Sequence, residues 1–260
     1  MGIINATPDS FYSDSRCNGR EAARQRVRAM LSGGVDMIDV GACSTRPGAP
    51  DITADEEYMR LADALEGVRR EAPDMIVSVD TWRSSVARRC IEEWGVQIVN
   101  DVSGGTLDPD MFAVVAELKV PYVLMHMRGT PADMQSMTDY SDVTAEVLER
   151  LARRLAKLRL MGVAEVIVDP GFGFAKTLEQ NYALLAGLHR LTALGCPVLA
   201  GLSRKSMIWR ALDTTPDAAL AGTVALEWEC LRQGAAVLRA HDVRAAAETI
   251  RLFEIYRQNQ

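Results

Sequence analysis

Polar residues stand at the end of nearly every short apolar run in this 260-residue sequence. In a barrel of parallel strands, chemistry takes place where strands end and loops begin. Helix capping or solvation explains any one such residue, but eight placements in register predict a polar, mixed-charge mouth. The residues concerned are Asn5, Asp39, Asp80, Asn100 with Asp101, His126, Asp169, the segment 201–206 (GLSRKS), and Arg239 with His241.

Four of the polar residues have the chemistry to bind a planar heterocycle. Asp80, Asn100 and Asp169 end the third, fourth and sixth apolar runs, and Lys205 adds a cationic donor. A carboxylate accepts two parallel hydrogen bonds from an amino-pyrimidinone edge, and an amide serves the adjacent donor and acceptor. The alternative for Asp169 is a plain strand-exit turn with the Pro and Gly that follow it.

A second group of residues suits a phosphate-like anion. Asn5, Arg46, Arg239 and His241 are expected at strand ends, and Asp242 is expected to open the last helix. A helix N-terminus with Arg and His side chains binds anions readily. The segment GLSRKS differs from the GxxxxGK[ST] phosphate loop, which argues against nucleoside triphosphate hydrolysis. Three histidines without an HExxH motif argue against a histidine-rich zinc site.

Eight short runs rich in β-branched residues supply the strands that must position these side chains. Segments with helical periodicity separate the runs, and this alternation predicts one (β/α)₈ TIM barrel, a single α/β domain over residues 1–260. A doubly wound open sheet is the competing topology. The expected strands are 1–5, 35–41, 75–80, 96–100, 120–126, 165–169, 196–201 and 235–239.

Helix signals lie between these runs. Thr53 with Glu56, and Thr177 with Gln180, have capping-box spacing and predict helices over 53–70 and 177–188. Further helices are expected over 141–161 and 242–257. The apolar stripes expected to face the core are Met59, Ala62, Leu65 and Val68 in the first helix, and Val143, Val147, Leu151, Leu155 and Leu158 in the helix over 141–161.

Two of the expected strand-to-helix loops, 6–19 and 41–51, are long and rich in Gly and hydroxyl residues. Such loops commonly run to about 2–6 residues. Long loops at the catalytic end of a barrel typically close over a ligand. Surface insertion without a function is the alternative.

Composition narrows the class of protein. With 48% hydrophobic and 25% charged residues, the chain is neither disordered, collagenous nor a disulfide scaffold. A net charge of −6 without a basic stripe argues against nucleic-acid or membrane partners, so an anionic ligand needs a locally cationic pocket. Five cysteines without a CxxC pair, and no apolar run near the ~20 residues of a membrane span, indicate a cytoplasmic protein.

Eight segments, in order, resemble the signature segments of the dihydropteroate synthase family. They are MGIINATPDSF, DVGACSTRPGA, SVDT, VNDVSGG, LMHMRGTP, DPGFGFAK, GLSRKS and RAHDV, and the resemblance runs from residue 1 to about residue 245. It implies a (β/α)₈ barrel, usually a homodimer. It also implies an enzyme that condenses 6-hydroxymethyl-7,8-dihydropterin diphosphate with p-aminobenzoate and releases pyrophosphate with Mg²⁺. In this family sulfonamides compete with p-aminobenzoate.

The resemblance assigns roles to residues at matching positions, with Asp80, Lys205, Arg239 and His241 as the catalytic set. It implies a pterin site of Asp80, Asn100, Met125, Asp169, Phe174, Gly201 and Lys205, and a diphosphate site of Asn5, Arg46, Arg239 and His241, with Asn5 also at Mg²⁺. The p-aminobenzoate residues are Thr45, Arg46, Pro47, Phe174, Ser203 and Lys205.

Three features depart from the family pattern. Ala6 stands where Val is common, and Cys43 stands where the second loop usually has Glu, in GGESTRP. Family members also carry a short hairpin ahead of the first barrel strand, so either the barrel floor is less covered in this chain or the sequence begins after such a hairpin.

Two other functions remain open. A pterin-binding methyltransferase shares the barrel, but it has no use for the STRP loop or the RxHD end. A non-catalytic pterin-binding barrel is the other alternative, which the change from Glu to Cys43 keeps open.

Overall fold

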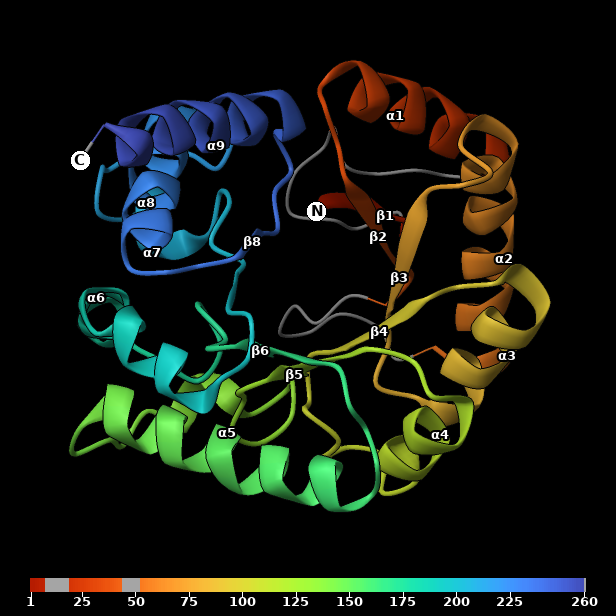
Figure 1. Ribbon diagram of the computed structural model, residues 1–260, viewed down its shortest axis with the longest axis horizontal. Coiled ribbons are helices and arrows are strands. Elements are labelled where there is room, and N and C mark those ends of the chain that lie inside the picture. Colours follow the sequence, from red (N-terminus) through yellow and green to blue (C-terminus); the bar gives the residue numbers. More distant parts are fainter. Residues whose placement is uncertain (8–18, 44–51, 260) are drawn as a thin grey trace.

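The computed structural model describes residues 1–7, 19–43 and 52–259 of the chain. Its strands form a central ring that helices surround (Figure 1). The strands are β1 (Gly2–Asn5), β2 (Met37–Gly41), β3 (Ile76–Asp80), β4 (Ile98–Asp101), β5 (Tyr122–Met125), β6 (Val166–Asp169), β7 (Leu199–Ala200) and β8 (Val237–Leu238). The helices are α1 (Arg20–Ser32), α2 (Ala54–Glu71), α3 (Ser84–Trp94), α4 (Met111–Leu118), α5 (Val143–Leu160), α6 (Leu178–Ala186), α7 (Ser206–Trp209), α8 (Leu220–Arg232) and α9 (Val243–Gln258), with short 3-10 helices η2 (Met134–Ser136) and η3 (Leu188–Leu194).

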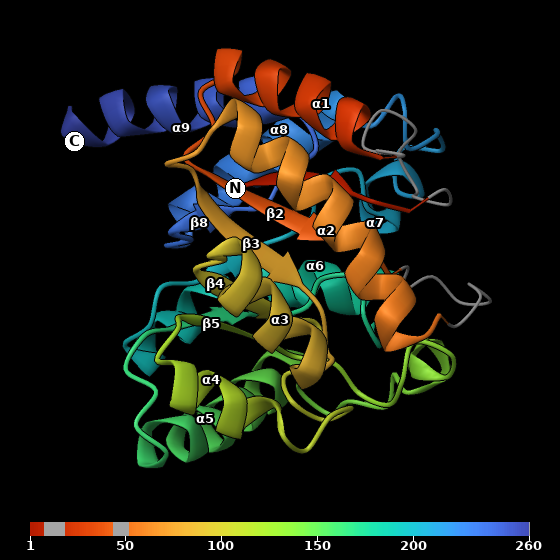
Figure 2. The same cartoon turned by 90° about the vertical axis from the view of Figure 1, so that its right-hand side faces the viewer.

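The strands close on themselves, as the barrel prediction requires. β1 to β6 pair in consecutive parallel order, and β7 pairs with β8. Bridges Val168–Val198 and Gly2–Ala240 join the two sheets at both edges. The closed ring confirms the (β/α)₈ barrel and excludes the doubly wound open sheet. In Figure 2 the arrowheads of β2 and β3 point in the same direction, as parallel strands must.

Both predicted capping boxes are present. The Thr53 and Thr177 hydroxyls accept from the backbone N–H groups of Glu56 and Gln180, whose side chains accept from the threonine N–H groups in return. These reciprocal bonds satisfy N–H groups that no helical carbonyl reaches. They place the starts of α2 and α6 where the sequence predicts them.

The buried face of α2 differs from the apolar stripe predicted for it. Met59 was expected in the core, but its side chain is 62% exposed. The buried face of α2 includes Tyr58, Leu61, Leu65 and Val68, which are spaced by three or four residues. In α5, by contrast, the whole predicted stripe is buried. Its members are Val143, Val147, Leu151, Leu155 and Leu158.

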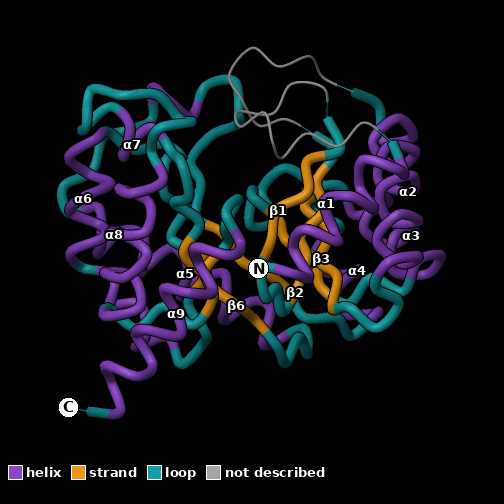
Figure 3. Tube along the Cα trace, turned by 90° about the horizontal axis from the view of Figure 1, so that it is seen from above, coloured by secondary structure: helices purple, strands orange, loops and turns teal. Residues whose placement is uncertain are grey.

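The apolar core lies between the strands and the helix ring, with a smaller cluster inside the barrel at the amino ends of the strands. In that cluster Ile98, Val123 and Leu199 are buried, and Met1 and Met37 are partly buried against them. Figure 3 shows the strands between banks of helices. The opposite, carboxyl end holds polar side chains together with a third apolar cluster, formed by Val102, Met125, Met127, Met134 and Ala175. None of the described helices has both the length and the apolarity of a membrane span.

Candidate active site

The barrel brings six of the predicted site residues to the carboxyl ends of their strands. Parallel strands in one closed sheet all end on the same side, so these residues ring one mouth. They are Asn5 at the end of β1, Asp80 ending β3, Asn100 in β4, Met125 ending β5, Asp169 ending β6, and Arg239 directly after β8. Gly201 and Lys205 follow β7 into the same region.

A buried network in the middle of this mouth joins three strands. The Asp39 carboxylate is fully buried, and its Oδ2 accepts from Asn100 Nδ2 at 2.9 Å and from Arg239 Nε at 2.7 Å. Arg239 Nη2 also donates to Asp80 Oδ2 at 2.7 Å. One guanidinium therefore holds two carboxylates, and it ties the expected pterin residues to an expected diphosphate residue.

Asp39 was expected at the mouth but without a role, and it lies inside β2, two residues before the end of that strand. Its Oδ1 is buried and accepts no hydrogen bond from the described residues. The signal in the sequence was a charged residue inside an apolar strand, because a buried charge requires partners. Those partners, Asn100 and Arg239, lie 61 and 200 residues away, so only the closed barrel identifies them.

A second network lines the wall formed by the loop after β6. Lys205 Nζ donates to Phe172 O at 2.6 Å and lies 4.7 Å from the centre of the Phe174 ring. Asp169 is buried, and its Oδ1 accepts from Gly171 N–H at 2.7 Å. The other oxygen, Oδ2, faces Gly201, where an added Cβ would lie 3.8 Å from it. Asp169, Phe174, Gly201 and Lys205 are thus brought together as expected.

The third cluster places His241 against Ser203. The Ser203 Oγ accepts from the His241 backbone N–H at 3.1 Å and lies 3.2 Å from Nδ1 of its ring. Asp242 directly precedes α9, as expected, but among the described residues its side chain caps no N–H group of this helix. Its carboxylate instead accepts two hydrogen bonds from Arg204, at 2.7 and 2.9 Å. This ion pair fixes the segment that carries Ser203 to the segment that carries His241.

Burial sets the ionisation of the carboxylates and the ammonium group. It raises the pKa of Asp80 to about 7, although Arg239 opposes the shift. It also raises the pKa of Asp169, against the nearby charge of Lys205. The pKa of Lys205 falls to about 8 because of burial, with Asp169 opposing. Neighbouring ionisable groups whose pKa values are shifted by burial and by one another are typical of functional sites.

His241 is not positively charged in the ligand-free site, although a residue that binds an anion would be expected to be. Burial, followed by the charges of Arg239, Arg26, Arg204 and Lys205, lowers its pKa to about 3. The ring is therefore neutral near pH 7 in the ligand-free site. An anion bound among these cations would offset their repulsion and raise the pKa of His241.

Cys43, which departs from the family pattern, lies beside a buried ion pair. Arg83 pairs with the fully buried Glu57 of α2 and donates to Ile52 O at 2.8 Å. Cys43 contacts the same guanidinium. Burial raises the pKa of the Cys43 thiol to about 11, so the thiol is neutral where the family has a carboxylate. Thr45, Arg46 and Pro47, with most of the two long loops, lie outside the described residues.

The comparisons with known proteins bear on this geometry. A family model described as "Pterin binding enzyme" matches residues 1–241. The chain is 42% identical to a dihydropteroate synthase of Synechocystis, over 95% of this chain and 86% of the relative.

The chain belongs to the pterin-binding enzyme family.

Solved structures of the family agree with this assignment. The Yersinia pestis dihydropteroate synthase, in complex with a sulfonamide drug, superposes with a TM-score of 0.94 at 36% identity, covering 99% of this chain and 94% of the other. A Thermus thermophilus dihydropteroate synthase in complex with 4-aminobenzoate gives a TM-score of 0.87 at 39% identity, with 98% and 93% coverage. A second structure of that enzyme is in complex with 6HMPPP and gives a TM-score of 0.83 at 38% identity, with 98% and 92% coverage. These likenesses confirm the barrel as the family fold.

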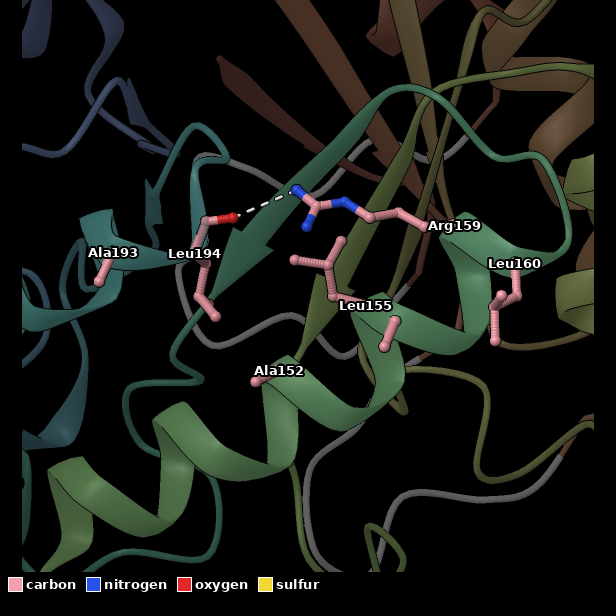
Figure 4. Close-up of a pocket in the computed structure, with 7 residues that line it drawn as sticks. Ala152, Leu155, Arg159, Leu160, Ala193 and Leu194 are labelled. Carbon is pink, nitrogen blue, oxygen red and sulfur yellow. Dashed lines mark hydrogen bonds between the residues drawn. The ribbon is translucent and has the colours of Figure 1, made fainter.

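A cavity of about 550 Å³ lies away from the family site, between α5 and η3 (Figure 4). In it Arg159 donates to Leu194 O at 3.2 Å, and the remaining lining is aliphatic. A cavity with one polar side chain lacks the converging groups that chemistry requires. Its lining residues are Ala152, Leu155, Ala156, Arg159, Leu160, Ala193 and Leu194.

Proposed function

We propose that this chain is a dihydropteroate synthase. It condenses 6-hydroxymethyl-7,8-dihydropterin diphosphate with p-aminobenzoate to give 7,8-dihydropteroate and pyrophosphate. The observation that carries the proposal is the convergence of Asp80, Asn100, Asp169 and Lys205 with Arg239 at one mouth, in a chain whose relatives along nearly its whole length are dihydropteroate synthases. Complexes of the Thermus thermophilus relative with 4-aminobenzoate and with 6HMPPP support both substrates.

The pterin ring is bound by its polar edge. Asp169 offers a buried carboxylate oxygen, and Asn100 offers an amide whose orientation is set by its bond to Asp39. Lys205 supplies a donor on the same wall. Buried groups of this kind reject analogues strongly, because a missing hydrogen bond leaves a polar atom unsatisfied. Met125, Phe174 and Gly201 complete the lining.

The proposed diphosphate site is formed by Asn5, Arg239 and His241, and Arg46, which lies outside the described residues, is assigned to it by the family resemblance. In the ligand-free site Arg239 is shared between Asp39 and Asp80, so the diphosphate competes with two carboxylates for one guanidinium. The charge of the bound diphosphate sets the protonation state of His241. The ring either takes up a proton or stays neutral, and in both forms it donates a hydrogen bond to the diphosphate. Charge-assisted bonds to the departing pyrophosphate strengthen as the C–O bond breaks, which lowers the barrier.

Mg²⁺ is the proposed cofactor, and the donor set at β1 fits it. The ion prefers oxygen ligands, and it usually takes one or two from the protein, with the rest from phosphates and water. The described residues hold no cluster of three or more His, Cys, Asp or Glu that could bind a metal alone, so the proposal takes the remaining ligands from the diphosphate and water. Asn5 would hold the ion through its amide oxygen at the edge of the diphosphate cluster. When bound, Mg²⁺ neutralises charge on the leaving pyrophosphate.

In the proposed reaction the pterin methylene is transferred from the diphosphate to the amine of p-aminobenzoate. Departure of pyrophosphate leaves a cationic methylene delocalised into the pterin, which an ionised Asp80 stabilises electrostatically. The aromatic amine attacks as the neutral species and loses its proton afterwards, so no strong general base is needed. Phe174, Lys205 and Ser203, with Thr45, Arg46 and Pro47, are the proposed p-aminobenzoate residues.

A homodimer and a cytoplasmic location complete the proposal. On α9, Leu252, Ile255 and Tyr256 are 62%, 51% and 49% exposed, which supports an apolar contact between two copies. Sedimentation of the wild type and of Leu252→Glu tests this contact, since a monomeric wild type would contradict it. The free thiols of Cys43, Cys90, Cys196 and Cys230 support a reducing compartment.

The decisive experiment measures pyrophosphate release from the pterin diphosphate with and without p-aminobenzoate. Release coupled to formation of dihydropteroate supports the synthase. Tight pterin binding without turnover would support the non-catalytic alternative. Methyl transfer from a methylated pterin, without pyrophosphate release, would support the methyltransferase.

A further inference from the structure

The Lys176 ammonium lies inside the loop that follows β6. The residue is 5% exposed, and its Nζ donates to Gly171 O at 2.9 Å and to Phe174 O at 3.0 Å. Nζ also lies 3.2 Å from Nδ1 of His126, which follows β5. An ammonium has three N–H donors and no acceptor, so these three contacts use its whole capacity, with Nδ1 as the acceptor.

The loop around this ammonium has an unusual backbone. Gly171 and Gly173 have φ of +69° and +81°, and Ala175 has φ of +51° without the freedom of a glycine. Left-handed conformation at a non-glycine residue is costly, and it persists where the surroundings enforce it. Lys176 donates to two carbonyls of this loop, and Asn181 of α6 accepts from Gly173 N–H at 2.7 Å.

The same loop carries the wall that contacts Lys205. Phe172 O accepts from Lys205 Nζ at 2.6 Å, and the Phe174 ring lies 4.7 Å from it. Lys176 bonds the carbonyls of residues 171 and 174, which flank these contacts. These bonds tie the buried Lys176 side chain to the same loop that contacts Lys205.

We propose that Lys176 is a positioning residue of the pterin subsite. Its ammonium fixes residues 170–175 so that Phe172 O and the Phe174 ring hold Lys205 beside Asp169. This inference deepens the proposed function and rests on it.

The charge of the Lys176 side chain changes near neutral pH. Burial lowers the pKa of Lys176 to about 7, with the Asp169 carboxylate opposing and Lys205 and Arg128 adding to the shift. His126 contacts the ammonium but is neutral, because burial lowers its pKa to about 2, with the charges of Lys176, Arg150 and Arg128 contributing. Among the charged groups that act on Lys176, the Asp169 carboxylate favours the ammonium form.

The test compares Lys176→Met with Lys157→Met, a matched control that removes an exposed lysine from α5. Calorimetry measures binding of the pterin diphosphate, and steady-state kinetics measure KM for p-aminobenzoate at saturating pterin diphosphate. We expect Lys176→Met to weaken pterin binding about ten- to a hundredfold, as loss of a charged hydrogen-bonding group does. The KM for p-aminobenzoate should rise by a smaller factor than the loss of pterin affinity, because Phe174 and Lys205 also belong to the proposed p-aminobenzoate site, and the control should match the wild type.

A double-mutant cycle with Lys205→Met separates positioning from general destabilisation. If Lys176 acts through Lys205, the two losses of pterin affinity are non-additive, with the double variant close to Lys205→Met alone. Additive losses, or equal losses for both substrates, would overturn the proposal. Lys176→Gln, which keeps an amide donor, replaces Met if that variant does not fold; failure of both to fold would show that Lys176 serves the fold as a whole. A wild type that does not bind pterin diphosphate refutes the proposed function, whereas unaltered binding in Lys176→Met refutes only this inference.

Discussion

Asp39→Asn separates the electrostatic role of this buried carboxylate from its shape. The amide has the same outline, and its Oδ1 still accepts from Asn100 Nδ2 and Arg239 Nε, while its Nδ2 takes the place of the oxygen that is unpartnered among the described residues. The substitution therefore removes one negative charge beside Asp80 with little change in packing. Asp39 is among the groups that raise the pKa of Asp80, after burial, so its removal lowers that pKa.

The size of the effect follows from the shared guanidinium. Oδ2 of Asp39 and Oδ2 of Asp80 each lie 2.7 Å from Arg239 Nη2, so the two oxygens are at most about 5.4 Å apart. Two unit charges at that distance repel by about 3 kcal/mol at an effective dielectric constant near 20. Residual screening reduces this, and we expect the midpoint of ionisation to move about one to two pH units lower.

The assay is the pH dependence of kcat/KM for the pterin diphosphate, which reports groups of the free enzyme. The wild type should lose activity as pH falls through about 7, where Asp80 becomes protonated. Asp39→Asn should keep its activity to lower pH, although its plateau falls about ten- to a hundredfold because Arg239 loses a charged acceptor. Asp36→Asn removes an exposed charge just before the same strand and should match the wild type. An acid limb that stays in place or moves to higher pH would refute the reasoning.

Four further predictions follow from the same structure. Asp169→Asn should weaken pterin binding by about tenfold or more, because it replaces a charged acceptor by an amide; unchanged affinity by calorimetry would contradict the role of Asp169. The His241 ring should titrate near pH 3 by NMR in the free protein and at higher pH with pyrophosphate bound, and a ring that titrates alike in both states would disprove the coupling. Cys43→Glu should leave pterin affinity unchanged and alter only p-aminobenzoate kinetics, so a loss of pterin affinity would count against the separation of the subsites. Leu151→Ala should lower the free energy of unfolding by about 2–5 kcal/mol, since this side chain is 1% exposed; denaturant melts that coincide with those of the wild type would show that the site collapses.

Local signals in the sequence determined the elements and their order. The capping boxes at Thr53 and Thr177 depend on hydrogen bonds between residues three positions apart. The apolar stripe of α5 depends only on the spacing of apolar residues within that helix. Such signals need no distant partner, so they are readable before the fold is known. Met59 was wrongly expected in the core for the same reason. Its helix carries two possible apolar stripes, and only the elements that pack against the helix decide which one is buried.

The site was readable only in part. Alternation of apolar strands with polar ends placed Asp80, Asn100 and Asp169 at one mouth, since parallel strands of a barrel share their direction. Which of these side chains contact one another at the mouth depends on how the strands close into a barrel. Arg239 reaches Asp39 across 200 residues of sequence, and no local pattern encodes that pairing.

The sequence by itself thus determined the barrel, its family and the residue types at its mouth. The tertiary structure decided their charge and partners. Burial made His241 neutral near pH 7, closure placed Asp39 under Arg239, and the loop after β6 folded around the Lys176 ammonium. Desolvation and contacts between distant segments exist only in the folded chain, and for this reason the ionisation and orientation of the site had to come from the structure.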